Sequence, residues 1–375
     1  MTRNSHRYRA RVLAAALMLT ACSSTPADGG DRNPEPSSPP STSEPSGTQA
    51  EVQTLLDGWA AAGSGGVAVA LANRTTPQLV LAAGSNGPNG AAISSDAEFR
   101  VGSLTKTYVA VMTLQLVDEG QVGLDDLVTQ YLPGLTIADG VTIRQLLAHR
   151  SGIPEHTDGE LGPAVLTDPA RTWRPADVLA LVEDQKRDFP PGDHFAYSNT
   201  NYIIAGLLLE QVTQRSLAEN LDERIVQPLG LRATYFAPDP ERGPIGAFSQ
   251  SLPGGTTSGA SYRALETAAG AAGAIVSTAG DVAVFIRALA DGDLLPPAVY
   301  AEMTNGLPAD GETLGVFSSY PPTSTGISNA GAIPGFTAFM QYDPATGYLL
   351  VLLVNDDTRS IEQLGNDLAG ILLSS

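Results

Sequence analysis

Residues 99–107 read Phe99-Arg100-Val101-Gly102-Ser103-Leu104-Thr105-Lys106-Thr107 and place a serine three residues before a lysine. Apolar residues recur from Leu104 to Val117 without a proline or glycine, which predicts a helix over 103–119. Side chains three residues apart share one face of a helix, so we expect the lysine amine to reach the serine hydroxyl. The positive end of the helix dipole would favour negative charge on that oxygen. The segment therefore predicts an activated serine nucleophile.

The lysine in this segment is unusual for the chain. Of 21 basic residues, only Lys106 and Lys186 are lysines. Arginine does not lose its proton in proteins, whereas a buried lysine can. Lys106 therefore fits a group that takes up and returns a proton. The spacing alone leaves coincidence open as an alternative, because serine is common in the chain.

The first 21 residues have the pattern of an export signal. Four arginines precede a short apolar run over 12–19, which is too short to span a bilayer. The segment ends in Leu19-Thr20-Ala21-Cys22, which resembles the lipobox of bacterial lipoproteins. This resemblance implies cleavage before Cys22, lipid on Cys22 and a cell-membrane location on the extracytoplasmic side. The alternative is an ordinary secretory signal in which the cysteine, the only one in the chain, is accidental.

The rest of the chain divides into a spacer and one domain. Residues 22–48 are nearly all Ser, Pro, Thr, Gly, Asp and Glu, a composition typical of a disordered linker. Residues 49–375 show neither a second linker nor an internal repeat, so we expect one domain there, and we expect a monomer. With 21 basic and 40 acidic residues the net charge is −19, which argues against a nucleic-acid partner.

The apolar patterns predict an α+β fold. Strand-like segments occur near both ends of the domain, over 67–72, 79–83, 338–342 and 348–354, with helices over 49–62 and 361–373. The middle of the domain is predicted to be mainly helical, over 103–119, 142–149, 175–186, 200–214, 216–227 and 280–290. We therefore expect one antiparallel sheet built from both chain ends, with flanking helices and an inserted helical lobe.

Other catalytic arrangements have little support in the sequence. The chain lacks a G-x-S-x-G motif, which argues against the α/β-hydrolase arrangement. Its four histidines, at positions 6, 149, 156 and 194, lack the spacing of a metal site such as H-E-x-x-H, so we predict neither a metal nor another cofactor. His149 lies at the end of a predicted helix and is interpreted as structural rather than catalytic.

A second polar segment can supply partners for the serine. A Pro-Gly turn at 191–192 leads to Tyr197 and Asn199, which stand just before an apolar helix. A phenol has an ordinary pKa of about 10. The ammonium of Lys106 is expected to lower the pKa of Tyr197, so that the phenol could act as a general base. Asn199 could hold the lysine and a substrate amide by hydrogen bonds. Taken alone, Tyr197 and Asn199 also fit an ordinary loop.

The order of these segments resembles a known family. Ser103-Leu104-Thr105-Lys106 followed by Tyr197-Ser198-Asn199 resembles the first two motifs of the penicillin-recognising serine hydrolases, in the branch of class C β-lactamases, D-Ala-D-Ala carboxypeptidases and related esterases. Residues 142–153, 197–209 and 273–281 are also similar to this branch.

The resemblance implies a β-lactamase/transpeptidase-like fold and a serine hydrolase. Its substrate would be a small molecule or a cell-wall peptide, with an amide, β-lactam or ester bond cleaved through an acyl-serine intermediate. The implied catalytic residues are Ser103, Lys106 and Tyr197, and Asn199 is implied to bind substrate.

The third motif of the family departs from its usual pattern in this chain. The matching segment, 328–336, has Asn329 where the family usually has Lys or His, and Ala330 where it often has a hydroxyl. Neither side chain is charged, which puts recognition of a substrate carboxylate in doubt. By analogy, Asn329, Gly331 and Ala332 line the substrate site, and the Ala332 N–H helps to stabilise the oxyanion. Two alternatives stay open: an esterase with an altered pocket, and a catalytically weak envelope protein that binds cell-wall peptide or a partner.

Overall fold

The computed structural model describes residues 47–87, 90–249, 251–252, 255–257, 262–307 and 313–374. The predicted signal peptide over 1–21, the lipidation site Cys22 and the predicted linker up to residue 46 lie outside the described residues. The predicted first helix is confirmed as α1 (Gly47–Ala61), which begins two residues earlier than expected.

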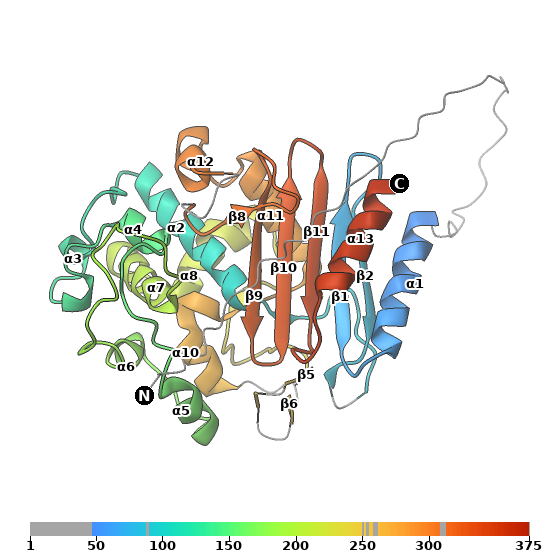
Figure 1. Ribbon diagram of the computed structural model, residues 1–375, viewed down its shortest axis with the longest axis horizontal. Helices are drawn as coiled ribbons and strands as arrows, with labels where there is room; N and C mark the ends of the chain where they lie inside the picture. Colours follow the sequence, from blue (N-terminus) through green and yellow to red (C-terminus); the bar gives the residue numbers. More distant parts are fainter. Residues whose placement is uncertain are drawn as a thin grey trace, which may run out of the picture.

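One six-stranded antiparallel sheet organises the molecule (Figure 1). Its strand order is β2-β1-β11-β10-β9-β8. The strands are β1 (Gly66–Ala72), β2 (Leu79–Gly84), β8 (Phe317–Ser318), β9 (Ile327–Ile333), β10 (Phe336–Asp343) and β11 (Tyr348–Val354). β1 pairs with β11 in a register that sets Val67 opposite Val354. The two chain ends therefore share one sheet, as the sequence predicted.

The centre of the sheet is covered on both faces, which explains why β1 is buried at every position. Val67, Val69 and Leu71 face a cluster formed with α1 and the C-terminal helix α13 (Glu362–Ser374). The two helices lie side by side over this part of the sheet (Figure 1). The alternate alanines of β1 face the main core, where α11 (Ala279–Asp291) packs against β1, β10 and β11. A row of small side chains on this face allows close packing of a helix.

The helical lobe is inserted between β2 and the last strands. Its helices include α2 (Thr105–Asp118), α3 (Val128–Tyr131), α4 (Ile143–Leu147), α5 (Leu161–Thr167), α6 (Pro175–Leu179), α7 (Asn199–Thr213), α8 (Leu217–Leu221), α9 (Gln227–Leu229), α10 (Arg263–Gly273) and α12 (Pro297–Thr304). Every residue of α2 from Thr105 to Leu114 is buried, and α2 packs against both α7 and α10. The helix predicted from the serine motif is thus the central helix of the lobe.

A few predicted elements differ from the structure. The helix predicted over 175–186 ends at Leu179, because the chain continues in a series of tighter turns up to Gln185. The helix predicted over 216–227 is present but contains a π-helical turn, Asp222–Val226. The sequence patterns did not predict the short helices α3 and α5, nor α10 and α12.

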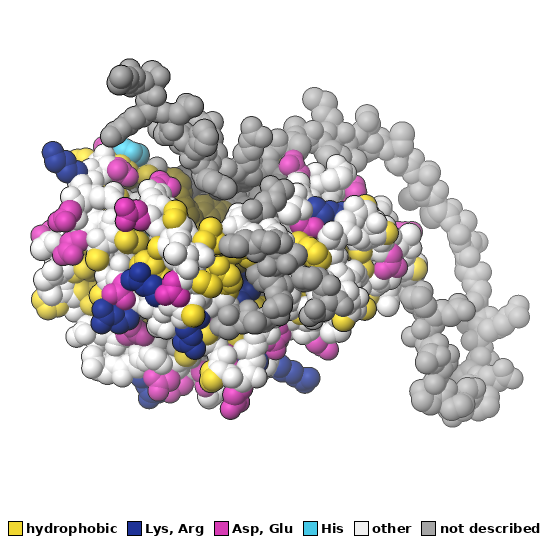
Figure 2. Space-filling view, turned by 90° about the horizontal axis from the view of Figure 1, so that it is seen from below, with side chains coloured by type: hydrophobic (Ala, Val, Ile, Leu, Met, Phe, Trp, Pro, Cys, Tyr) yellow, Lys and Arg dark blue, Asp and Glu magenta, His cyan; other side chains and the backbone are white. Residues whose placement is uncertain are grey.

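The surface of the described part carries charges of both signs. On the face seen in Figure 2, acidic and basic side chains are interspersed. Among the residues that the structure describes, none of the helices combines the length and the apolar character needed to cross a bilayer.

Candidate active site

Ser103 lies in a short 3-10 turn, Gly102–Leu104, that leads into α2. Val101 anchors the start of this turn, because its N–H donates to the Ile275 carbonyl over 3.0 Å. Gly102 has φ +53°, and a Cβ added there would lie 2.8 Å from the nitrogen of Ala332. A glycine is therefore required, both for its backbone conformation and for the close approach of β9. The turn presents the serine at the N-terminal end of a buried helix.

Lys106 contacts Ser103 as the spacing predicted. Its Nζ lies 2.9 Å from Ser103 Oγ, 2.7 Å from Asn199 Oδ1 and 2.7 Å from the Ala272 carbonyl oxygen. The lysine is almost completely buried. Burial lowers the pKa of Lys106 to about 7, and the negative charge of Glu155 opposes this shift. A large fraction of the amine is therefore neutral at neutral pH and able to accept a proton.

Tyr197 is the second partner of the serine. Its hydroxyl lies 2.8 Å from Ser103 Oγ, and the Lys106 Nζ is 5.0 Å from the centre of its ring. The prediction that the ammonium of Lys106 lowers the pKa of Tyr197 is wrong. Desolvation by the surrounding protein raises the pKa of Tyr197 above its usual range and outweighs the hydrogen bond with Ser103. Tyr197 as a residue is 39 % exposed, so it is a protonated phenol at the edge of the site that can pass on a proton.

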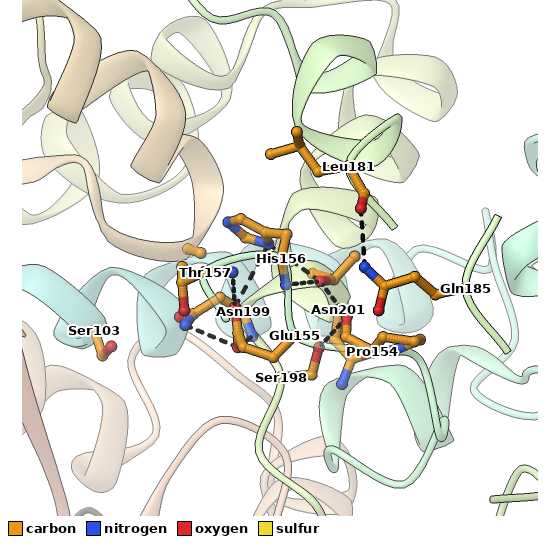
Figure 3. Close-up of polar contacts among 12 residues, drawn as sticks. Ser103, Pro154, Glu155, His156, Thr157, Leu181, Gln185, Ser198, Asn199 and Asn201 are labelled. Atoms are coloured by element: carbon orange, nitrogen blue, oxygen red, sulfur yellow. Dashed lines mark hydrogen bonds and ion pairs between the residues drawn. The ribbon is translucent and has the colours of Figure 1, made fainter. Parts of the chain in front are cut away.

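Asn199 is the first residue of α7 and holds the lysine, as expected. Its neighbour on the other side is Glu155, which the sequence reasoning missed. One oxygen of the Glu155 carboxylate accepts the backbone N–H of Asn199 over 2.6 Å and its Nδ2–H over 3.0 Å (Figure 3). A carboxylate at a helix N-terminus is favourable, but the residue that fills this position comes from a distant loop. The sequence offered no signal that joins positions 155 and 199.

The third motif lies beside the serine turn, but the side chain of Asn329 is hydrogen-bonded within the protein. A Cβ on Gly331 would overlap the carbonyl oxygen of Val101 and lie 3.0 Å from the nitrogen of Ser103, so β9 passes directly along the turn. The Nδ2 of Asn329 donates to Thr107 Oγ1 over 2.8 Å and to the Gly315 carbonyl over 3.3 Å.

The remaining polar atom of Asn329 is also used within the protein. Its Oδ1 accepts the N–H of Ala330 over 2.8 Å, and only 4 % of the residue is exposed. The Nδ2 of Asn329 is thus bonded to α2 and to the Gly315 backbone, and Ala330 adds no polar group. The substrate-binding roles of Asn329, Gly331 and Ala332 stay predictions.

The hollow next to the lysine is narrow and largely apolar. It has a volume of about 10 Å³, room for about one water molecule. It is lined by Lys106, His149, Phe195, Tyr197, Tyr202, Thr313, Gly315, Val316, Phe317 and Asn329. Phe195 is 40 % exposed, so aromatic side chains stand at its edge. Lys106 is the one cation among these lining residues.

His149 supports the tyrosine instead of reacting. Its ring stacks on that of Tyr197, with centroids 4.3 Å apart, and its Nδ1 accepts the N–H of Ser198 over 3.1 Å. Burial lowers the pKa of His149 to about 3, so the imidazole is neutral. These contacts fit its interpretation as a structural residue. Within the described ranges, His, Cys, Asp and Glu side chains form no group of three that could hold a metal ion.

Comparisons with known proteins agree with this geometry. The family model described as Beta-lactamase matches residues 52–372. Penicillin-binding protein 4 of Amycolatopsis lactamdurans is 29 % identical over 323 residues, covering 75 % of this chain and 80 % of that protein. The chain spans 55 % of the length of another relative, Protein flp of Staphylococcus aureus.

Two solved structures are similar over most of the chain. A D-stereospecific amidohydrolase from Streptomyces sp. is 31 % identical with a TM-score of 0.69, and the match covers 82 % of this chain and 94 % of that one. The D-amino acid amidase of Ochrobactrum anthropi SV3, in complex with D-phenylalanine, is 27 % identical with a TM-score of 0.74, covering 88 % of this chain and 99 % of that one. With its antiparallel sheet and inserted helical lobe, this chain belongs to the Beta-lactamase family and is a serine hydrolase of that fold.

Proposed function

We propose that the protein hydrolyses amide bonds of small substrates through an acyl intermediate on Ser103, and that amides of D-amino acids are the preferred class. The observation that carries this proposal is the set of contacts at one oxygen atom. Ser103 Oγ lies 2.9 Å from Lys106 Nζ and 2.8 Å from the Tyr197 hydroxyl, so a proton acceptor and a proton donor both touch the nucleophile.

The steps follow from the state of these groups. Neutral Lys106 accepts the hydroxyl proton of Ser103 while Oγ attacks the substrate carbonyl. The N–H groups of Ser103 and Ala332 stabilise the resulting oxyanion; losing one such donor typically costs about 10² to 10³ in rate. Protonated Tyr197 then donates to the leaving nitrogen, and the proton on Lys106 restores the phenol. Water hydrolyses the acyl-enzyme by the reverse path, which returns the proton to Ser103 and releases the acid.

The third motif favours an amide without a free carboxylate on its leaving group. Asn329 uses its amide within the protein, and Ala330 has no polar side chain. A carboxylate placed there would be desolvated without a partner, which is costly. An amide of an amino acid releases ammonia or an amine and needs no such partner. The two amidase relatives support this substrate class, and their names support a preference for D-amino acids.

The test compares substrates on the purified protein and on Ser103→Ala. We expect D-phenylalanine amide to be hydrolysed faster than L-phenylalanine amide and faster than a peptide that ends in D-Ala-D-Ala. Ser103→Ala should lose all hydrolysis, because the nucleophile is gone. Turnover of any of these substrates by Ser103→Ala at the wild-type rate would overturn the proposed mechanism.

A second candidate is recognition of penicillins, which the name of the Amycolatopsis relative favours. A fluorescent penicillin and a fluorophosphonate, each followed by intact mass, separate the candidates. Labelling of Ser103 by both reagents would support a penicillin-recognising enzyme. Labelling by the fluorophosphonate alone would support the amidase, or an esterase if simple acyl esters react faster than amides. Labelling by neither would leave a catalytically weak binding protein as the better description.

A further inference from the structure

Glu155 lies in the loop between α4 and α5 and has a hydrogen-bond donor at each of its carboxylate oxygens. Oε2 accepts the backbone N–H and the Nδ2–H of Asn199, and Oε1 accepts the N–H of Thr157 over 2.9 Å. Its side chain is only 14 % exposed. Figure 3 shows the three residues together, with the asparagine between the carboxylate and the first turn of α2.

The carboxylate determines which way the Asn199 amide faces. A side-chain amide has a donor end and an acceptor end, whereas a carboxylate only accepts. The Nδ2 must therefore point to Glu155, which leaves Oδ1 to face Lys106 at 2.7 Å. In the flipped amide, an NH₂ group would meet the lysine amine, Oδ1 would face the carboxylate without a donor, and Glu155 Oε2 would keep only the backbone N–H of Asn199. Such a mismatch typically costs about 1 to 3 kcal/mol for a buried group.

The orientation of this amide determines where the lysine lone pair points. A neutral amine has two N–H bonds and one lone pair. Asn199 Oδ1 and the Ala272 carbonyl, both 2.7 Å from Nζ, accept the two N–H groups. The third neighbour, Ser103 Oγ at 2.9 Å, then meets the lone pair and donates its own proton. Two fixed acceptors thus prepare the neutral amine to act as a base toward the serine.

We propose that Glu155 is a positioning residue which, by holding the Asn199 amide, directs the lone pair of Lys106 at the hydroxyl of Ser103. This inference rests on the proposed function, because it assigns a role within the same acylation step. Glu155 does not touch the reacting atoms. It acts through Asn199 and through its negative charge.

Glu155 places a negative charge near Lys106, whereas the other titratable groups that face the lysine are neutral. The other titratable groups that face Lys106 are two tyrosines and two histidines: Tyr197, Tyr202, His149 and His156. Burial raises the pKa of both tyrosines and lowers the pKa of both histidines, so all four are neutral near pH 7. The Glu155 carboxylate opposes the lowering of the Lys106 pKa that burial causes. Removing the charge should therefore lower the pKa of the lysine further.

The experiment measures the rate of Ser103 labelling by a fluorophosphonate between pH 5 and 9, on the full chain and its variants. Glu155→Gln keeps an oxygen for Asn199 but removes the charge. In this variant we expect the rise of the labelling rate with pH to occur about one pH unit lower, and the maximal rate at high pH to stay close to that of the wild type. Glu155→Ala also releases the amide, and its plateau should fall about 10- to 10²-fold. Glu160→Gln, which removes an exposed acid from the end of the same loop, is the matched control and should change neither quantity.

A double-mutant cycle separates positioning from general support of the fold. If Glu155 acts through Asn199, adding Glu155→Ala to Asn199→Ala should cost less than about 2-fold further. Thermal melts and circular dichroism check that each variant is folded. An unmoved pH limb in Glu155→Gln, or losses that multiply in the double variant, would overturn the inference while leaving the proposed function intact. Absence of labelling at Ser103 in the wild type would instead overturn the proposed function, and the inference with it.

Discussion

At the scale of single residues, the site depends on one lysine in a chain that otherwise uses arginine. Lys106 and Lys186 are the only lysines. The structure supplies the physical reason for this choice at position 106: burial brings the pKa of the amine to about 7, where it can exchange a proton. An arginine in the same place would stay charged. Desolvation raises the pKa of Tyr197, so its phenol stays protonated and can donate a proton. The base and the acid of the proposed reaction are thus Lys106 and Tyr197, respectively.

The pKa of Lys106 leads to a pH prediction. Because the pKa is lowered to about 7, the neutral amine is the minor form below pH 7 and the main form above it. We expect kcat/KM for D-phenylalanine amide to rise with pH through about 7 and then level off. Lys106→Arg keeps the positive charge but cannot act as a base, so kcat/KM should fall about 10³-fold.

Lys186→Arg is the matched control, because it changes the other lysine, which is exposed, and it should leave the profile unchanged. Steady-state rates between pH 5 and 9 check all three proteins. An Lys106→Arg variant with the wild-type rate would rule out the lysine as the base.

At the scale of elements, the site is assembled from four segments far apart in the chain: the turn before α2, the start of α7, the end of α10 and β9. The sequence predicted α2 and α7 well, because each is a long, largely apolar run without proline that is buried over most of its length. It predicted Ser103, Lys106, Tyr197 and Asn199 as candidates, and the structure brings these four together.

The site residues that the sequence did not predict are those whose contacts depend on the folded chain and not on a local sequence pattern. Glu155 and the carbonyl of Ala272 contact the motif residues only after the chain has folded, so their own sequence neighbourhoods carry no sign of it. The segment that forms β9 was singled out only as the family's third motif and not as a strand, because its small residues show no clear alternation. The direction of the Tyr197 pKa shift was mispredicted, since desolvation raises this pKa and the degree of burial cannot be judged from spacing.

The contact between β9 and the serine turn gives a prediction for Gly331. An alanine at this position would push its Cβ into the Val101 carbonyl, and both partners are backbone held in place by β9 and the turn. We expect Gly331→Ala to lower the free energy of unfolding by about 3 kcal/mol, a large overpacking effect, and to reduce activity by displacing Ser103. Ala330→Ser is the control for the urea midpoint, because the neighbouring position is exposed. Equal urea midpoints for Gly331→Ala and wild type would show that this close approach is not needed.

At the scale of the whole molecule, the sheet depends on both ends of the domain. β1 and β2 come from the first part of the described chain and β9 to β11 from the last, with the helical lobe between them. The sequence predicted this arrangement because its strand patterns occur only near the two ends. The order of strands and the covering of the sheet by α1 and α13 required the structure. The described part of the chain begins with α1, which lies on the side of the sheet away from the lobe (Figure 1).

The segment before α1 gives the last prediction. We propose that the protein is exported and held at the outer face of the cell membrane by lipid on Cys22, with the following segment as a spacer. Two lipid chains anchor a protein stably, whereas the acidic domain itself should avoid anionic lipid. In bacteria expressing the full chain and fed a clickable fatty acid, we expect label on the wild type in the membrane fraction. Cys22→Ser should lose the label and leave that fraction, whereas Ser23→Ala should behave as wild type. Membrane-bound, labelled Cys22→Ser would contradict the anchor, and an unlabelled wild type found outside the cell would favour an ordinary secretory signal.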